Sequence, residues 1–277
     1  DGCIFVAEVK NMTADYHLHS CFSGDSETPT EEMIKKGLAQ GLSLMCMTEH
    51  LDMDYPYSDV SFDLDADAYF REMHRLQEAY HDRIEIRIGA ELGIQPQLGD
   101  AYRQWLSDKS FDFLIGSTHL VDRFDPYYPD FWTSYDAASG VNRSLDVTLQ
   151  NIRAFDDFDV YGHIDYIIRY VPDGDRVFSY KKHADQVDAV LKLLIEKGKG
   201  IEINTGGYKA GLSEPNPCHD VLRRYKELGG EIITMGSDAH TTEYVAYRFA
   251  DAKEVLRECG FRYFTVFRER KAEFVPL

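Results

Sequence analysis

Residues 13–50 read TADYHLHSCFSGDSETPTEEMIKKGLAQGLSLMCMTEH and contain a complete strand–helix–strand unit. Two short apolar runs, residues 13–19 and 42–50, are typical of buried β-strands. Residues 29–41 between them have the pattern of an amphipathic helix. The expected ends of this helix are Thr28 or Thr30 at its start and Gly37 or Gly41 at its close. Because a helical crossover joins parallel strands, the stretch predicts an α/β fold.

The same alternation continues along the rest of the chain. Five further strands are expected at residues 84–92, 111–119, 159–165, 200–205 and 231–240. Helices are expected at about 65–80, 96–106, 141–155, 180–197, 219–228 and 243–259, and residues 261–277 as a strand with a returning edge segment. Seven β/α units without a linker favour a closed or nearly closed barrel in a single domain. A doubly wound open sheet is the alternative.

Composition limits the partners. The chain has 277 residues and a net charge of −18, from 48 acidic and 30 basic residues, which argues against nucleic acid as a partner. It has no apolar run long enough to span a bilayer, so no membrane partner is expected. Five scattered cysteines without a C-x-x-C pair favour a reducing, cytoplasmic setting. Residues 1–11 precede Met12 and are interpreted as an N-terminal extension, with the domain at 12–277.

Side chains that bind metals stand where the predicted strands end. His17 and His19 end the first strand, His50 the second, Glu91 the third, His119 the fourth, His163 the fifth, and Asp238 and His240 the seventh. In a barrel these carboxyl ends converge on one face. Imidazoles and carboxylates without a thiolate cluster favour Zn, Mn or Fe. With Asp25 the candidates number nine, so two or three divalent ions are expected, with Glu91 as their bridge.

Seven stretches carry a family resemblance. They are DYHLHS (15–20), TEH (48–50), GAELG (89–93), GSTHLV (116–121), GHIDYIIRY (162–170), EINTGGYKAG (202–211) and GSDAH (236–240). Together they resemble the polymerase and histidinol phosphatase (PHP) superfamily across nearly the whole chain. The segment EINT and the terminal YFTVFRERKAEFVPL (263–277) favour its histidinol-phosphate phosphatase branch.

The resemblance implies a distorted TIM-like barrel of seven β/α units that holds a trinuclear site. By the family pattern, the first ion would take His17, His19, Glu91 and Asp238, the second Glu91, His119 and His163, and the third Asp25, His50 and His240. Many relatives have histidine at the position of Asp25, which leaves the identity of the metal open. Arg169 resembles the phosphate-binding arginine of the family, and Lys209 stands where relatives usually have arginine. Arg169, Asp238 and Glu91 are the implied catalytic residues.

The implied reaction is hydrolysis of a small phosphate monoester, L-histidinol phosphate, by water activated at the metals. The aromatic residues 127–132 would cover the imidazole of this substrate or only cap the barrel. Another PHP activity, on nucleotides or on another small phosphate ester, is the alternative, and a barrel that keeps metals for structure is a third reading. A homodimer is also considered.

Overall fold

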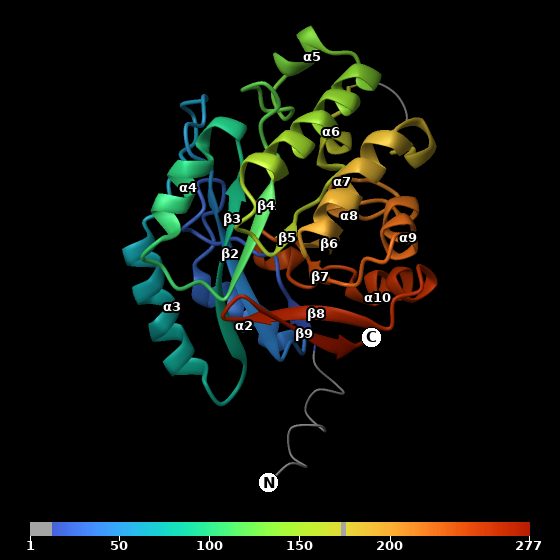
Figure 1. Ribbon diagram of the computed structural model, residues 1–277. Coiled ribbons are helices and arrows are strands. Elements are labelled where there is room, and N and C mark those ends of the chain that lie inside the picture. Colours follow the sequence, from blue (N-terminus) through green and yellow to red (C-terminus); the bar gives the residue numbers. More distant parts are fainter. Residues whose placement is uncertain (1–12, 173–175) are drawn as a thin grey trace.

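The computed structural model describes residues 13–172 and 176–277 (Figure 1). The predicted extension, residues 1–11, lies outside the described residues. Seven parallel strands pair in chain order to form one sheet. These strands are β1 (Ala14–Asp15), β2 (Leu44–Leu51), β3 (Glu85–Gly93), β4 (Phe113–Ser117), β5 (Val160–Tyr161), β6 (Gly200–Asn204) and β7 (Ile233–Gly236).

The two edges of this sheet meet. The backbone N–H of Tyr16 donates to the Met235 carbonyl at 2.9 Å, and that of Asp238 donates to the His17 carbonyl at 2.8 Å. Leu18 forms an isolated parallel bridge with Ala239. The sheet is therefore a nearly closed barrel, as predicted, and not a doubly wound open sheet.

Two strands are shorter than expected because side chains replace their backbone partners. After β1, the backbone N–H of Leu18 donates to the hydroxyl of Thr48 at 3.1 Å. After β5, the backbone N–H of His163 donates to the Glu202 carboxylate at 2.8 Å. Both interruptions lie at or next to predicted metal ligands, His17 and His19 in the first case and His163 in the second.

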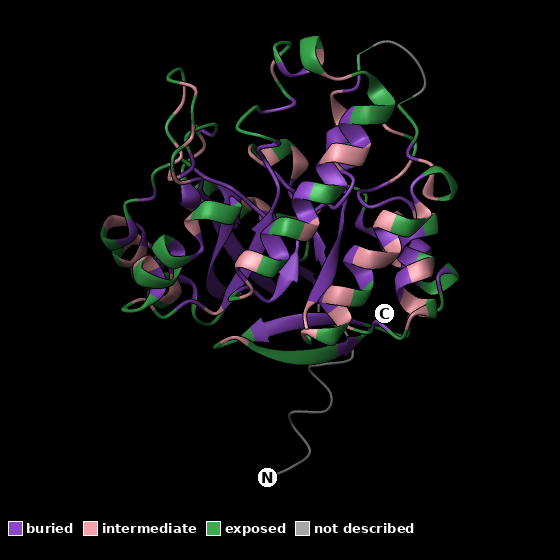
Figure 2. Ribbon diagram, turned by 45° about the horizontal axis from the view of Figure 1, so that its top comes forward, coloured by how far each residue is buried: buried purple, intermediate pink, exposed green. Residues whose placement is uncertain are grey.

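Helices surround the barrel, with the buried strands inside them (Figures 1 and 2). The α-helices are α2 (Thr30–Ala39), α3 (Ala66–Tyr80), α4 (Gly99–Leu106), α5 (Phe131–Ser134), α6 (Ala137–Ala154), α7 (Ala184–Glu196), α8 (Gly206–Lys209), α9 (His219–Glu227) and α10 (Phe249–Glu258). The 3₁₀ turns are η1 (Pro96–Leu98), η2 (Tyr166–Arg169), η3 (Tyr180–Lys182) and η4 (Thr242–Tyr244). Across the described ranges, none of the helices combines the length and the apolar character needed to cross a bilayer.

The start of α2 differs from the prediction. Neither threonine caps this helix, which follows Pro29 without a side-chain cap. The hydroxyl of Thr28 donates to the His240 carbonyl, and that of Thr30 contacts Ser20, so both hold loops at the site instead. Gly41, with a φ of +79°, follows the end of the helix as expected.

A hairpin of β8 (Tyr263–Arg268) and β9 (Lys271–Pro276) covers the amino end of the barrel (Figure 1). The hydroxyl of Tyr16 donates to the Phe267 carbonyl at 2.8 Å, and the guanidinium of the fully buried Arg87 donates to the same carbonyl. The backbone N–H of Ile233 donates to Thr265 Oγ1 at 3.1 Å. This end is thus filled, and the carboxyl end is where side chains can meet a ligand.

Candidate metal centre and its pocket

Glu91, in β3, lies at the centre of the carboxyl face. It is completely buried, and five imidazoles from other segments surround its carboxylate. The distances from its oxygens to the nearest ring nitrogens are 3.0 Å for His17, 3.5 Å for His19, 3.2 Å for His50, 3.1 Å for His119 and 3.0 Å for His163. The structure therefore brings together the predicted ligands from the first five strand ends around the carboxylate that was expected to bridge the ions.

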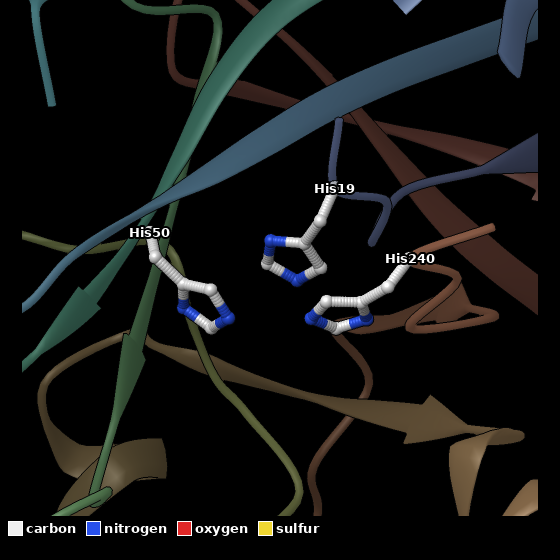
Figure 3. Close-up of side chains that lie close together, drawn as sticks. All are labelled: His19, His50 and His240. Carbon is white, nitrogen blue, oxygen red and sulfur yellow. The ribbon is translucent and has the colours of Figure 1, made fainter. Parts of the chain in front are cut away.

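The ligands predicted after β7 lie beside this group. Asp238 Oδ1 is 3.6 Å from His19 Nε2, and Asp25 Oδ2 is 3.0 Å from His240 Nε2. The rings of His19, His50 and His240 point toward one another, as Figure 3 shows. His19 thus belongs to this group as well as to the group around Glu91, whereas the family pattern placed it with one ion only.

The donor set fits divalent cations. His19 Nε2 and His50 Nδ1 are buried without a hydrogen-bond partner among the described residues. Burial, together with the rings of His50 and His240, lowers the pKa of His19 well below its ordinary value, so this imidazole is neutral, as a metal ligand must be. Such unpartnered nitrogens between buried carboxylates are costly unless a cation lies among them.

The two central carboxylates remain ionised. Burial alone would raise the pKa of Glu91, but the rings of His17, His119 and His50 hold it well below its ordinary value. Burial would likewise raise the pKa of Asp238, and the guanidinium of Arg169 holds it low. Asp238 also has a left-handed backbone with a φ of +56°, a conformation that is uncommon outside glycine and is often found at functional sites.

A second layer of side chains orients the rings. Asp52, directly after β2, contacts His119 Nδ1 at 2.7 Å with one oxygen, and its other oxygen lies 3.8 Å from His50 Nδ1. Glu49 acts indirectly, because it accepts a hydrogen bond from Ser23, whose hydroxyl is 3.2 Å from His19 Nδ1. Each contact fixes which ring nitrogen faces the cluster.

Sequence reasoning missed Glu202 as a member of this layer. It is fully buried in β6, and its Oε2 is 2.8 Å from His17 Nδ1. Its other oxygen accepts the hydrogen bond from the His163 backbone and one from the Asn204 side chain at 3.0 Å. The available signal was an acidic residue in the middle of the apolar strand GIEINT.

Arg169 lies next to the metal ligands, at the end of η2. Its Nη1 donates to Asp238 Oδ2 at 2.7 Å, its Nε to Asn216 at 2.8 Å and its Nη2 to Asn204 at 3.0 Å. A Cβ at Gly206 would lie 2.9 Å from both Arg169 Nη2 and Asp238 Oδ2, so only glycine lets the turn after β6 pass so close to this pair. The guanidinium is therefore rigidly placed.

Lys209 is held much more loosely. It is exposed in α8, and its ammonium lies 5.2 Å from the centre of the Tyr244 ring. It supplies positive charge near the site without a fixed orientation.

A cavity of about 550 Å³ opens above the cluster. Arg169 and Lys209 line it together with six of the candidate ligands, Asp25, His50, His119, His163, Asp238 and His240. Of the aromatic residues 127–132, Tyr127 and Tyr128 line the cavity, whereas Trp132 packs on the core and donates to the Pro126 carbonyl. The volume suits a small molecule.

The geometry agrees with the comparison to known families. The model of the PHP domain family matches residues 15–206. The chain belongs to the PHP family. Its resemblance to this family, predicted from the strand-end motifs, is thereby confirmed.

Two relatives match this PHP protein over most of their length. The histidinol-phosphatase of Lactococcus lactis subsp. lactis (strain IL1403) is 31% identical over 260 residues, which cover 94% of this chain and 96% of the relative. A protein of Clostridium acetobutylicum named as a probable histidinol-phosphatase is 30% identical over 263 residues, 94% of this chain and 98% of its own.

One solved structure matches closely. Histidinol phosphate phosphatase from L. lactis, crystallised with zinc, L-histidinol and phosphate, has a TM-score of 0.88 at 30% identity and covers 94% of this chain and 98% of its own. The match confirms the predicted fold, a TIM-like barrel of seven β/α units in one domain.

Proposed function

We propose that this PHP protein hydrolyses L-histidinol phosphate to L-histidinol and phosphate with two or three divalent ions, Zn, Mn or Fe. The observation that carries the proposal is the position of Glu91 among five imidazoles, beside a guanidinium fixed on Asp238. The L. lactis structure with zinc, L-histidinol and phosphate supports the same chemistry.

The proposed ligands are the nine predicted side chains, His17, His19, Asp25, His50, Glu91, His119, His163, Asp238 and His240. When bound, divalent ions lower the pKa of water and attract phosphate oxygens. Glu91 would be shared between ions, because its two oxygens contact different imidazoles. Asp238 has two tasks, since one oxygen faces His19 and the other holds Arg169.

Arg169 would bind the phosphate group. Its three nitrogens each donate one hydrogen bond within the protein, and its remaining N–H groups are available to phosphate oxygens in the cavity. Lys209 would add positive charge without bidentate contact. The protein has a net charge of −18, so Arg169 and Lys209 provide a local positive charge that attracts a small anion to the cavity.

Turnover of two substrates tests the proposal. Protein reconstituted with Mn, Zn or Fe is assayed on L-histidinol phosphate and on bis-p-nitrophenyl phosphate. We expect release of phosphate from the monoester and far slower reaction of the diester. A preference for the diester would instead support a phosphodiesterase that acts on nucleotides, and no turnover of either substrate would support a structural role for the metals.

Two further proposals concern the setting of the protein. A cytoplasmic location is supported by the four described cysteines, all of which are free thiols. The homodimer stays a prediction, and its test is the molar mass in solution by light scattering.

A further inference from the structure

Aromatic side chains line the cavity above the cluster together with the candidate ligands. Besides Tyr128 there are five of them, and we call these five the aromatic collar: Tyr55, Phe62, Tyr127, Tyr166 and Tyr170. They come from the loops after β2 and β4 and from the segment after β5. Phe62 contacts the ring of His50, and Tyr166 contacts that of His163, at centroid distances of 5.1 and 4.8 Å. Two members of the collar are therefore in direct contact with candidate metal ligands.

Asp125 also lines the cavity, and it contacts two members of the aromatic collar. It is only 7% exposed, although it lies in a loop. Its Oδ2 accepts a hydrogen bond from the Tyr55 hydroxyl at 2.7 Å, and its Oδ1 accepts one from the Tyr127 backbone at 2.8 Å. Two members of the collar thus fix both oxygens, and each oxygen keeps a lone pair for another donor.

The other carboxylates of the cavity already have a task or lie in solvent. Asp52 orients His119, Asp25 faces His240, and Asp238 holds Arg169. Asp59 is exposed. Among the carboxylates that line the cavity, Asp125 alone is buried without an ion-pair contact to a histidine or an arginine.

Within the part of the chain that the structure describes, no lysine, arginine or histidine pairs with Asp125. Nearby Arg123 pairs with Asp54, and Arg143 pairs with Asp122. Burial raises the pKa of Asp125 above its ordinary value, and the hydrogen bonds from Tyr127 and Tyr55 and the ring of His119 offset this effect only in part. A buried carboxylate of this kind is stabilised when a cation binds beside it.

We propose that Asp125 is a specificity residue that accepts a hydrogen bond from a cationic nitrogen of the substrate, while the aromatic collar packs around that part of the molecule. The inference rests on the proposed function. L-Histidinol phosphate has a phosphate for Arg169 and two nitrogen-bearing groups, an ammonium and an imidazole. Aromatic faces and a carboxylate together favour such groups.

The test compares two phosphate monoesters on the metal-loaded protein. Asp125→Asn keeps the shape of the side chain and removes its charge. For L-histidinol phosphate we expect kcat/KM to fall about 30-fold, mostly through KM, because a charge-paired contact is lost. For p-nitrophenyl phosphate, which has no cationic nitrogen, we expect a change of less than about twofold. Asp63→Asn, at an exposed position of the loop after β2 that does not line the cavity, is the control and should change neither substrate.

Two more measurements define the contact. Tyr55→Phe removes one hydrogen bond that orients Asp125 and should reproduce a smaller loss with the same selectivity. O-Phosphoethanolamine, which has the ammonium but no imidazole, shows which of the two substrate groups contacts Asp125. A loss with Asp125→Asn on this substrate assigns the ammonium, and an unchanged rate, beside the loss on L-histidinol phosphate, assigns the imidazole.

An equal fall in kcat/KM for both monoesters in Asp125→Asn would overturn the assignment, because it would indicate that Asp125 has a structural role. An unchanged kcat/KM for L-histidinol phosphate would also overturn it. If the unmodified protein cleaves p-nitrophenyl phosphate but not L-histidinol phosphate, the proposed function fails and this inference fails with it.

Discussion

Glu91 illustrates how much a single position decides. It is a carboxylate without any exposed surface, and its oxygens lie within 3.5 Å of nitrogens from five histidines. Removing it would leave the imidazoles from separate strand ends without a common partner. Metal binding at this position depends on the side chains that fix the orientation of each imidazole ring.

Glu202→Gln tests this orienting layer. A glutamine keeps the size of the side chain but removes the charge beside His17 Nδ1, so the ring nitrogen that faces the cluster becomes a weaker ligand. We expect metal affinity to fall about 10- to 100-fold, as measured by competition with a chelator.

The control for this variant is Glu85→Gln. Glu85 lies at the opposite end of β3 from the site, where it pairs with Arg87 and Arg268. Its substitution should leave metal affinity unchanged. Equal losses in the two variants would show that Glu202 acts on the fold and not on the metal ligand.

Arg169→Ala tests the proposed phosphate contact. We expect kcat/KM for L-histidinol phosphate to fall about 100-fold, with metal content preserved, because a fixed guanidinium near the reacting group is lost. Lys209→Ala should cost much less, since this side chain is exposed and has no fixed orientation. If activity of Arg169→Ala stays within a few-fold of the unmodified protein, the phosphate assignment is wrong.

The site was predictable at the level of position but not of orientation. Strand ends of a barrel converge, so the placement of His17, His119 and Asp238 followed from the strand pattern. The contact of Asp52 with His119 did not, because it depends on how a loop after β2 reaches the end of β4. Glu202 was missed because its segment was used as a strand and as part of the family resemblance, without a task for the carboxylate itself.

At the scale of elements, the pattern predicted where strands and helices lie better than where they end. β1 and β5 have two residues each, since Thr48 and Glu202 take the hydrogen bonds that would extend them. A side-chain interruption of this kind is a tertiary effect, and periodicity within one strand has no means of showing it. The same holds for Thr28, whose hydroxyl contacts His240 instead of capping α2.

We expect one contact between α7 and α9 to make the free energy of unfolding depend on pH. Asp188 accepts two hydrogen bonds from Arg224, at 2.8 and 2.6 Å, and these hold the pKa of Asp188 below its ordinary 3.8. A carboxylate whose pKa is lowered on folding stabilises the protein above the unfolded pKa and loses this effect as the pH falls. We expect Asp188→Asn to lower the free energy of unfolding by about 1 kcal/mol at pH 7 and at pH 5.

Urea denaturation at pH 7, 5 and 3, with chelator present throughout, measures this difference. The gap between Asp188→Asn and the unmodified protein should shrink only below pH 3.8. Asp146→Asn, at an exposed position of α6, should show no gap at any pH. A gap that is the same at all three values would contradict the ion-pair explanation.

At the scale of the whole molecule, the two ends of the barrel have different tasks. The β8–β9 hairpin covers the amino end (Figure 1), where Arg87 donates to Phe267, and the polar ligands occupy the carboxyl end. Because the ligands come from six strand ends, metal binding should connect segments that are far apart in sequence. Stability and metal content are therefore expected to be coupled.

Thermal unfolding tests that coupling. A ligand that binds only the folded protein raises its stability by mass action, so metal at 100 times its dissociation constant should add about 2.7 kcal/mol. We expect a rise in Tm of about 5 °C or more over the chelated protein, measured by differential scanning calorimetry. An unchanged Tm would show that the described side chains do not hold the metal.

The central claim is that the strand ends jointly bind several ions that the reaction needs. The most direct test is a titration of metal-free protein with Mn or Zn, with phosphate release from L-histidinol phosphate followed at each addition. We predict that activity rises until two or three equivalents are bound per chain and then stays constant. Full activity at one equivalent, or activity in the metal-free protein equal to that of the loaded protein, would contradict the claim.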